Sequence, residues 1–170
     1  MARTLSAVAR EAGGELVGED SAFEGVSIDS RELKSGALFV AISGDRFDGN
    51  DFLADAQSKG AAGAMVSRLT SFPFPQVRVL DTRDAFAQAA RAWRGNFSIP
   101  VIAVTGSNGK TTVKALIASI LGVRREICVT RGNLNNDLGV PLTLMELGEE
   151  HEVLVLSLIH ISEPTRRYAI

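Results

Sequence analysis

The residues best suited to chemistry lie in one segment, Val101-Ile-Ala-Val-Thr-Gly-Ser-Asn-Gly-Lys-Thr-Thr-Val113. An apolar strand, a glycine turn and a Lys-Thr pair that opens a helix follow one another here, as in loops that cradle phosphate groups. Gly106 and Gly109 permit backbone torsions and a close approach that a side chain would prevent. The backbone N–H groups of Ser107 to Thr111 can then converge on phosphate oxygens.

Two side chains of this segment add a charge and a metal ligand. Lys110 supplies a point charge for the β- and γ-phosphates of a nucleotide, and the Thr111 hydroxyl suits a Mg²⁺ ion that bridges them. The loop is shorter than the common G-x-x-x-x-G-K-[ST] pattern, because position 104 is Val. The alternative is an ordinary strand-to-helix turn rich in small residues. We predict a nucleotide site made of Gly106, Ser107, Asn108, Gly109, Lys110, Thr111 and Thr112, with Thr111 as the metal ligand.

Three other polar segments are candidates for substrate binding. Asn135 and Asn136 follow a predicted strand, at the end where open α/β sheets bind ligands, although simple turn chemistry would also explain them. The residues Asp29-Ser30-Arg31 follow another short strand, where the alternative is a capped turn with a solvated arginine. Arg46 and Asp48 lie in a loop flanked by glycines, which a surface turn would explain equally well.

Composition places the chain among soluble globular proteins. It has 170 residues, a net charge of −2 and a single cysteine, Cys128. The charge argues against general nucleic-acid binding or a polybasic membrane contact, and one cysteine excludes an internal disulfide framework. No apolar run approaches the roughly 20 residues that span a bilayer, and the start of the chain has no signal-peptide core. We therefore expect a cytoplasmic protein without membrane insertion.

The pattern of apolar and turn residues predicts alternating helices and strands. The helix expected at 51–59 should be capped by Asn50 or Asp51, and the helix expected at 82–94 by Asp81. The β-branched strand 101–105 should be buried on both faces. Helices are expected at 4–12, 51–59, 82–94, 110–121 and 138–147, and strands at 15–17, 25–28, 37–42, 64–66, 76–80, 101–105, 127–130 and 153–156.

This succession predicts an α/β fold with two domains that meet between residues 80 and 100. A small mixed α/β N-terminal domain is followed by an incomplete P-loop-type ATPase domain with a parallel sheet. We expect strand 153–156 to form an unpaired edge of that sheet.

Three motifs resemble the Mur ligases, and together they resemble the MurF-type branch. Residues 105–112 are similar to the nucleotide loop that Mur ligases share with folylpolyglutamate synthases. The segment Thr130-Arg-Gly-Asn-Leu-Asn-Asn-Asp-Leu-Gly-Val-Pro-Leu-Thr-Leu144 is similar to one that characterises the MurF type. Residues 27–31 and 44–49 resemble the UDP-sugar-binding domain of the MurE and MurF types.

The resemblance implies ATP-dependent ligation of D-Ala-D-Ala to UDP-MurNAc-tripeptide through an acyl phosphate, in peptidoglycan synthesis. ATP and Mg²⁺ would be required, and a monomer is the simplest expectation. Residues 1–82 would bind the UDP-sugar peptide, and residues 83–156 would form the first part of the ATP-binding domain. Catalytic roles fall to Lys110, Asn135 and Asn136, and substrate binding to Asp29, Ser30, Arg31, Arg46 and Asp48.

The chain departs from the family at position 157. MurF-type ligases continue with a Mg²⁺-binding Glu and then Leu-Gly, whereas this chain has Ser157. Residues 157–170 resemble the translation of a sequencing adapter, so we expect a non-native tail and an inactive N-terminal fragment without the family's carbamylated lysine, adenine contacts and C-terminal domain. Alternatives are a MurE-type or cyanophycin-synthetase-like ligase, and a non-catalytic nucleotide-binding module.

Overall fold

The computed structural model describes residues 3–44, 47–132 and 134–158. The chain divides into two compact α/β units, Met1–Ala92 and Trp93–Ile170. Among the described residues, none of the helices has the length and apolarity that crossing a bilayer requires.

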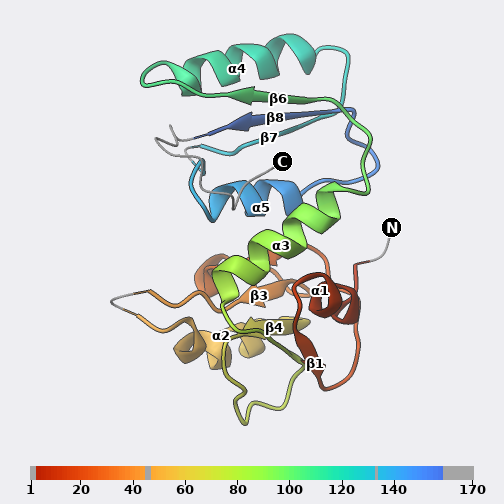
Figure 1. Ribbon diagram of the computed structural model, residues 1–170, viewed down its shortest axis with the longest axis vertical. Helices are drawn as coiled ribbons and strands as arrows, with labels where there is room; N and C mark the ends of the chain where they lie inside the picture. The colour runs from red at the N-terminus through yellow and green to blue at the C-terminus, as the bar shows by residue number, and fades with distance from the viewer. Residues whose placement is uncertain (1–2, 45–46, 133, 159–170) are drawn as a thin grey trace. The chain divides into compact units, whose positions relative to one another are not determined.

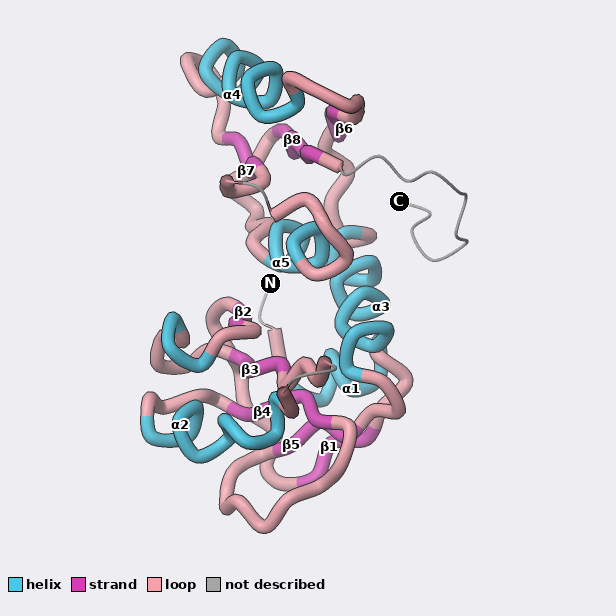
Figure 2. Tube along the Cα trace, turned by 90° about the vertical axis from the view of Figure 1, so that its left-hand side faces the viewer, coloured by secondary structure: helices cyan, strands magenta, loops and turns pink. Residues whose placement is uncertain are grey.

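The first unit is built around a mixed five-stranded sheet (Figure 2). Its order is β1-β5-β4-β3-β2, in which β2 to β5 run parallel and β1 is antiparallel to β5. The strands are β1 (Glu15–Val17), β2 (Val26–Ser27), β3 (Leu38–Val40), β4 (Gly63–Val66) and β5 (Gln76–Arg78). The helices are α1 (Leu5–Glu11), α2 (Leu53–Ser58) and α3 (Thr82–Arg94), whose last two residues fall in the second unit, and the 3-10 turns are η1 (Ser30–Glu32) and η2 (Gly49–Phe52).

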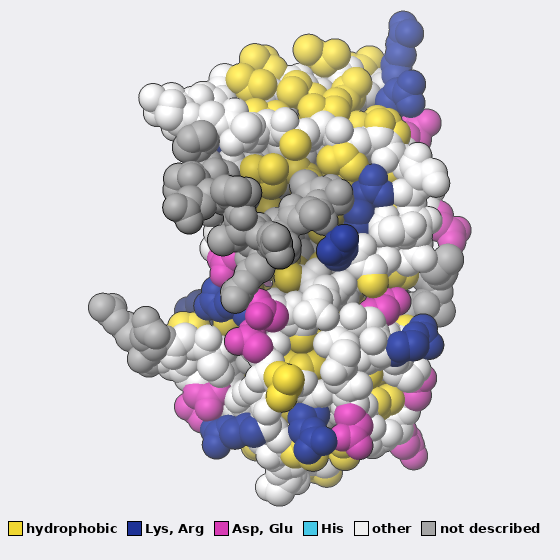
Figure 3. All heavy atoms as spheres, in the orientation of Figure 1, with side chains coloured by type: hydrophobic (Ala, Val, Ile, Leu, Met, Phe, Trp, Pro, Cys, Tyr) yellow, Lys and Arg dark blue, Asp and Glu magenta, His cyan; other side chains and the backbone are white. Residues whose placement is uncertain are grey.

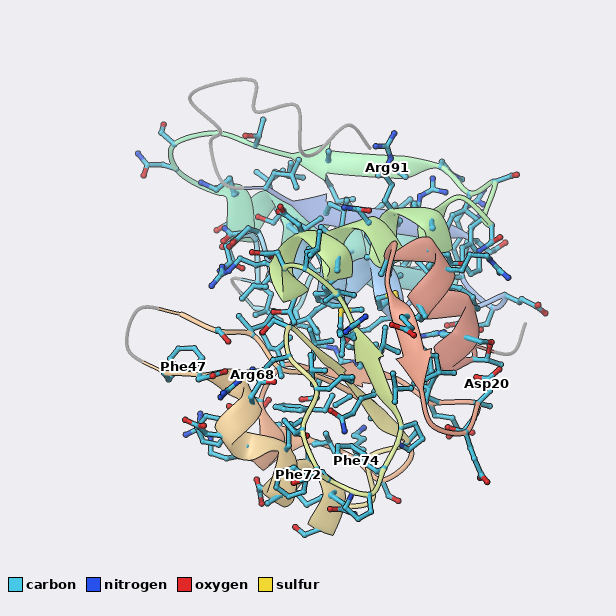
Figure 4. All side chains as sticks on the ribbon, turned by 60° about the horizontal axis from the view of Figure 1, so that its bottom comes forward. Asp20, Phe47, Arg68, Phe72, Phe74 and Arg91 are labelled. Atoms are coloured by element: carbon cyan, nitrogen blue, oxygen red, sulfur yellow. The ribbon has the colours of Figure 1, made fainter. Side chains whose placement is uncertain are left out.

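Buried apolar side chains hold this unit together. Phe72 and Phe74, from the loop between β4 and β5, pack against a core cluster and lie side by side in Figure 4. Asp81 caps α3 as predicted, since its carboxylate accepts the N–H groups of Arg83 and Asp84. The cluster consists of Leu33, Ala37, Phe39, Ala41, Leu53, Ala56, Ala64 and Val66.

The predicted cap of the second helix is wrong. Neither Asn50 nor Asp51 caps it, because the chain first forms the 3-10 turn η2 and only then enters α2. Asp48 is the cap of η2, and its carboxylate accepts the N–H of Asn50 at 2.9 Å. Asp48, two residues before Asn50, thus takes the capping role that the sequence pattern assigned to Asn50 or Asp51.

The described part of the second unit contains a parallel three-stranded sheet in the order β6-β8-β7. Helices α4 and α5 lie on opposite faces of this sheet (Figures 1 and 2). Trp93, the first residue of this unit, is linked to the segment after α5, because its indole N–H donates to the carbonyl of Leu147 at 3.0 Å. The elements are β6 (Val101–Val104), α4 (Lys110–Leu121), β7 (Ile127–Val129), α5 (Gly139–Met145) and β8 (Val153–Ser157).

Two expectations about this sheet are wrong. Strand β8, expected at an unpaired edge, is the central strand and is buried along its whole length, because β6 and β7 both pair with it. Strand β6, expected to be buried on both faces, lies at an edge of the described sheet and leaves Ala103 exposed. An apolar run alone does not reveal the position of a strand in its sheet.

Helix α4 presents apolar side chains to solvent. Figure 3 shows them gathered over this helix. The exposed fractions are 45% for Val113, 59% for Leu116 and 72% for Ile120. The opposite face of α4, which faces the sheet, carries a buried charged residue, Lys114.

Candidate functional site

The predicted phosphate loop, residues 105–112, joins the carboxyl end of β6 to the start of α4. Gly109 is the N-cap of α4 with a φ of 78°, and Gly106 has a φ of 142°. Both values lie where L side chains are strained, so the turn depends on glycine for its conformation. Space is not the constraint, because a Cβ on Gly109 would meet no atom within 4 Å.

The N–H groups of this loop are available to a ligand. Within the described part of the chain, those of residues 107–112 donate to no protein acceptor. The α4 dipole adds partial positive charge at the same place. Ser107, Asn108, Thr111 and Thr112 are exposed at the rim of the loop. Free N–H groups at the start of a helix form a binding site suited to a phosphate group.

Lys110 bends back over the loop, where its ammonium group donates to the carbonyl of Gly106. The charge therefore stays beside the free N–H groups. The neighbouring Thr111 hydroxyl is exposed at the first turn of α4. The described residues contain no group of three or more His, Cys, Asp or Glu side chains able to hold a metal.

The loop that contains the two predicted asparagines follows β7, at the same edge of the sheet as the phosphate loop. The Asn136 side-chain oxygen accepts the N–H of Gly139 at 2.9 Å, which fixes the start of α5. In the described structure, the side-chain amide nitrogens of Asn135 and Asn136 donate to no protein acceptor. Asn136 thus has a structural contact through its oxygen and free N–H donors on its other side.

The described members of the predicted substrate set, Asp29, Ser30, Arg31 and Asp48, lie in the segments that follow β2 and β3 in the first unit. The Arg31 guanidinium holds the Asp29 carboxylate through both oxygens, with a shortest distance of 2.6 Å, and lowers the pKa of Asp29 to about 2. Ser30 is buried, and its carbonyl accepts a hydrogen bond from Lys59 at 2.7 Å. Arg31 therefore pairs with a carboxylate of its own turn.

Asp48 is the centre of a second polar cluster. Its carboxylate accepts hydrogen bonds from Ser43 at 2.8 Å and from the Asn50 amide at 2.6 Å, and it pairs with Arg68 at 2.8 Å. Arg46 lies outside the described residues, so its predicted role stays a prediction. Sequence reasoning missed Arg68, which follows β4 and is labelled in Figure 4. Only the parallel pairing of β3 with β4 brings it to Asp48.

The Asp48 cluster predicts a loss of stability in acid. Hydrogen bonds from Asn50 and Ser43, together with Arg68, hold the pKa of Asp48 at about 2, below the ordinary 3.8. A depressed pKa in the folded state stabilises the protein above about pH 4, and this contribution is lost as the pH falls toward 2. We expect Asp48→Asn to lower the Tm at pH 7 and to flatten the fall of Tm between pH 5 and about pH 2.5. Thermal unfolding followed by circular dichroism measures both.

The matched control is Asp51→Asn, which removes an exposed carboxylate from the same 3-10 turn η2 that Asp48 caps. It should leave the pH profile of the wild-type chain in place. Equal profiles for Asp48→Asn and the wild type would contradict the role given to the cluster.

Cys128 takes no part in either site. Its thiol is buried and contacts the carbonyl of Thr143 at 3.6 Å. Burial raises the pKa of Cys128 to about 11, so the thiolate that a nucleophile requires is scarce at neutral pH.

Comparison with known families matches both units. The family description "Mur ligase family, catalytic domain" covers residues 22–94, and "Mur ligase middle domain" covers residues 104–162. The UDP-N-acetylmuramoyl-tripeptide–D-alanyl-D-alanine ligase of Escherichia coli K12 is 44% identical over 155 residues. This similarity covers 91% of the present chain and 34% of the ligase.

Solved structures give the same relationship. A crystal structure of MurF from Acinetobacter baumannii matches with a TM-score of 0.86 and 37% identity, covering 94% of this chain and 36% of that one. The MurF ligase from Thermotoga maritima in complex with ADP matches with a TM-score of 0.70 and 37% identity, covering 80% and 32%. The chain thus spans about a third of the length of these relatives.

Proposed function

Because the chain belongs to the Mur ligase family, we propose that it serves the ATP-dependent ligation of D-Ala-D-Ala to UDP-N-acetylmuramoyl-tripeptide in peptidoglycan synthesis. The observation that carries this proposal is the loop at the start of α4, with its free N–H groups and Lys110, beside the loop that contains Asn135 and Asn136. A cytoplasmic monomer remains our expectation.

The second unit would hold Mg·ATP. The N–H groups of residues 107–112 would bind phosphate oxygens, and Lys110 would exchange the Gly106 carbonyl for a phosphate. A Mg²⁺ ion fits this loop, because Mg²⁺ is commonly held by one hydroxyl or carboxylate, phosphate oxygens and water. Thr111 would supply the hydroxyl. When bound, the ion would neutralise charge on the phosphates during transfer.

The reaction that the resemblance implies would proceed in two steps. The terminal carboxylate of the tripeptide attacks the γ-phosphorus of ATP, giving an acyl phosphate and ADP. The amine of D-Ala-D-Ala then attacks the acyl carbon, loses a proton, and the tetrahedral intermediate expels phosphate. The amides of Asn135 and Asn136 would orient the carboxylate and the transferred phosphoryl group through their free N–H donors, while Lys110 offsets the negative charge.

The first unit would bind the UDP-sugar part of the substrate. Its candidate residues other than Arg46 lie after the neighbouring parallel strands β2 and β3, where open sheets bind ligands. Asp48 would hold the Ser43 hydroxyl in place, and Asp29 would hold the guanidinium of Arg31 ready for a phosphate. The assigned set is Asp29, Ser30, Arg31, Arg46 and Asp48.

Nucleotide binding is the direct test. We expect Mg·ATP to shift the amide resonances of residues 106–112 in ¹⁵N-labelled protein, and UDP to shift those of residues 29–31 and 47–50. Unshifted resonances in the phosphate loop at millimolar Mg·ATP would contradict the proposal.

We also expect no ligation by this chain. Ser157 stands where the resemblance implies a Mg²⁺-binding Glu, and it is buried at the end of β8. A coupled assay of ADP release, with UDP-MurNAc-tripeptide, D-Ala-D-Ala and Mg·ATP, should stay at background. Turnover above background would contradict this expectation.

A further inference from the structure

One buried cation has no role in the proposed chemistry. Lys114 lies on α4 one helical turn after Lys110, and its side chain is only 5% exposed. Among the described residues it is the only buried Lys, Arg, Asp or Glu. A buried lysine is costly unless its ammonium group is well bonded, so its partners indicate its purpose.

The partners of Lys114 among the described residues are two backbone carbonyls of the turn that follows β7. The Lys114 ammonium group donates to the carbonyl of Thr130 at 2.6 Å and to that of Gly132 at 2.7 Å. Within the described part of the chain, no carboxylate forms an ion pair with it. The ammonium group of Lys114 therefore holds this turn in place. The chain continues from the turn into the loop of Asn135 and Asn136.

The same turn is joined to the central strand. The Thr130 hydroxyl accepts the N–H of Ser157 at 3.1 Å, and the Thr130 N–H donates to Val155 at 3.0 Å. Ser157 in turn lies opposite Val104, the last residue of β6 before the phosphate loop. Lys114 thus joins α4 to a turn that is itself bonded to β8, and the end of β8 pairs with the end of β6.

We propose that Lys114 is a positioning residue, which ties the turn at 130–132 to α4 and so sets the asparagine loop relative to the phosphate loop. The effect on nucleotide binding rests on the proposed function, whereas the contact between Lys114 and the turn at 130–132 does not. Because α4 begins in the phosphate loop, the contact makes the geometry of one loop depend on the other. Loss of the tie should loosen residues 130–138 and weaken nucleotide binding at a distance from the phosphates.

The test compares Lys114→Met, which keeps the length of the side chain without donors, with Lys114→Arg, which keeps charge and donors. In the chain without ligand, we expect Lys114→Met to raise hydrogen–deuterium exchange of residues 130–138 about tenfold, through easier local opening. It should also weaken Mg·ATP binding about fivefold, whereas Lys114→Arg should stay within about threefold of wild type in both measurements.

The matched structural control is Thr143→Val, which removes a buried hydrogen bond to Gly139 in the same unit. It should lower the Tm without changing exchange at 130–138. A Lys114→Met chain that loses Tm but keeps wild-type exchange and affinity would overturn the proposal. If that variant does not fold, Lys114→Gln, which stops short of the two carbonyls, carries the same comparison. Failure of the wild type to bind Mg·ATP would refute the proposed function, while exchange would still decide the role of Lys114.

Discussion

Replacing Lys110 with methionine should weaken Mg·ATP binding by about 30-fold to 150-fold, the equivalent of one charge-assisted hydrogen bond of roughly 2–3 kcal/mol. The reason is the position of its ammonium group, which lies beside a loop with free N–H groups and, among the described residues, bonds only to the Gly106 carbonyl. Methionine keeps the length of the side chain but offers neither charge nor donor. Isothermal titration with Mg·ATP measures the change.

Lys34→Met is the matched control for that substitution. Lys34 is exposed in the first unit, so the same change of residue type alters the net charge equally without touching the phosphate loop. Its affinity for Mg·ATP should match that of the wild type. If both variants weaken binding alike, general electrostatic attraction and not a contact in the loop would explain the effect.

Much of the second unit was predictable because its signals are local. The order of strand, glycine turn and Lys-Thr needs only neighbouring residues, and both the helix at Lys110–Leu121 and the membership of the Mur ligase family are confirmed. The signals that failed depend on distant neighbours. Nothing within residues 153–157 indicates that strands on both sides will pair with them.

The polar clusters show the same limit. Asp48 was a candidate from its own loop, but its partner Arg68 is 20 residues away and reaches it only through the pairing of β3 with β4. The burial of Lys114 could not be predicted for a similar reason, because a lysine on a helix normally indicates a solvent-exposed face. Its burial results from the turn after β7 folding against α4, which no residue near position 114 encodes.

Gly109→Val should abolish measurable Mg·ATP binding. Gly109 caps α4 at a φ of 78°, a conformation that costs a residue with a Cβ roughly 1–2 kcal/mol and a β-branched residue more. The turn would relax to a negative φ, and the N–H groups that it aligns would then point in different directions. Because several of these donors act on one ligand, their joint misalignment costs more affinity than the loss of a single side chain.

A matched substitution separates strain from function. Gly36, in the first unit, has a φ of 80° and, like Gly109, open space where a Cβ would stand. Gly36→Val should therefore lose stability by an amount similar to Gly109→Val, about 2 kcal/mol in denaturant unfolding, while its nucleotide affinity stays at the wild-type value. Equal affinity in both variants would mean that the left-handed turn at Gly109 serves only to start the helix, and that the alignment of the loop N–H groups does not govern binding.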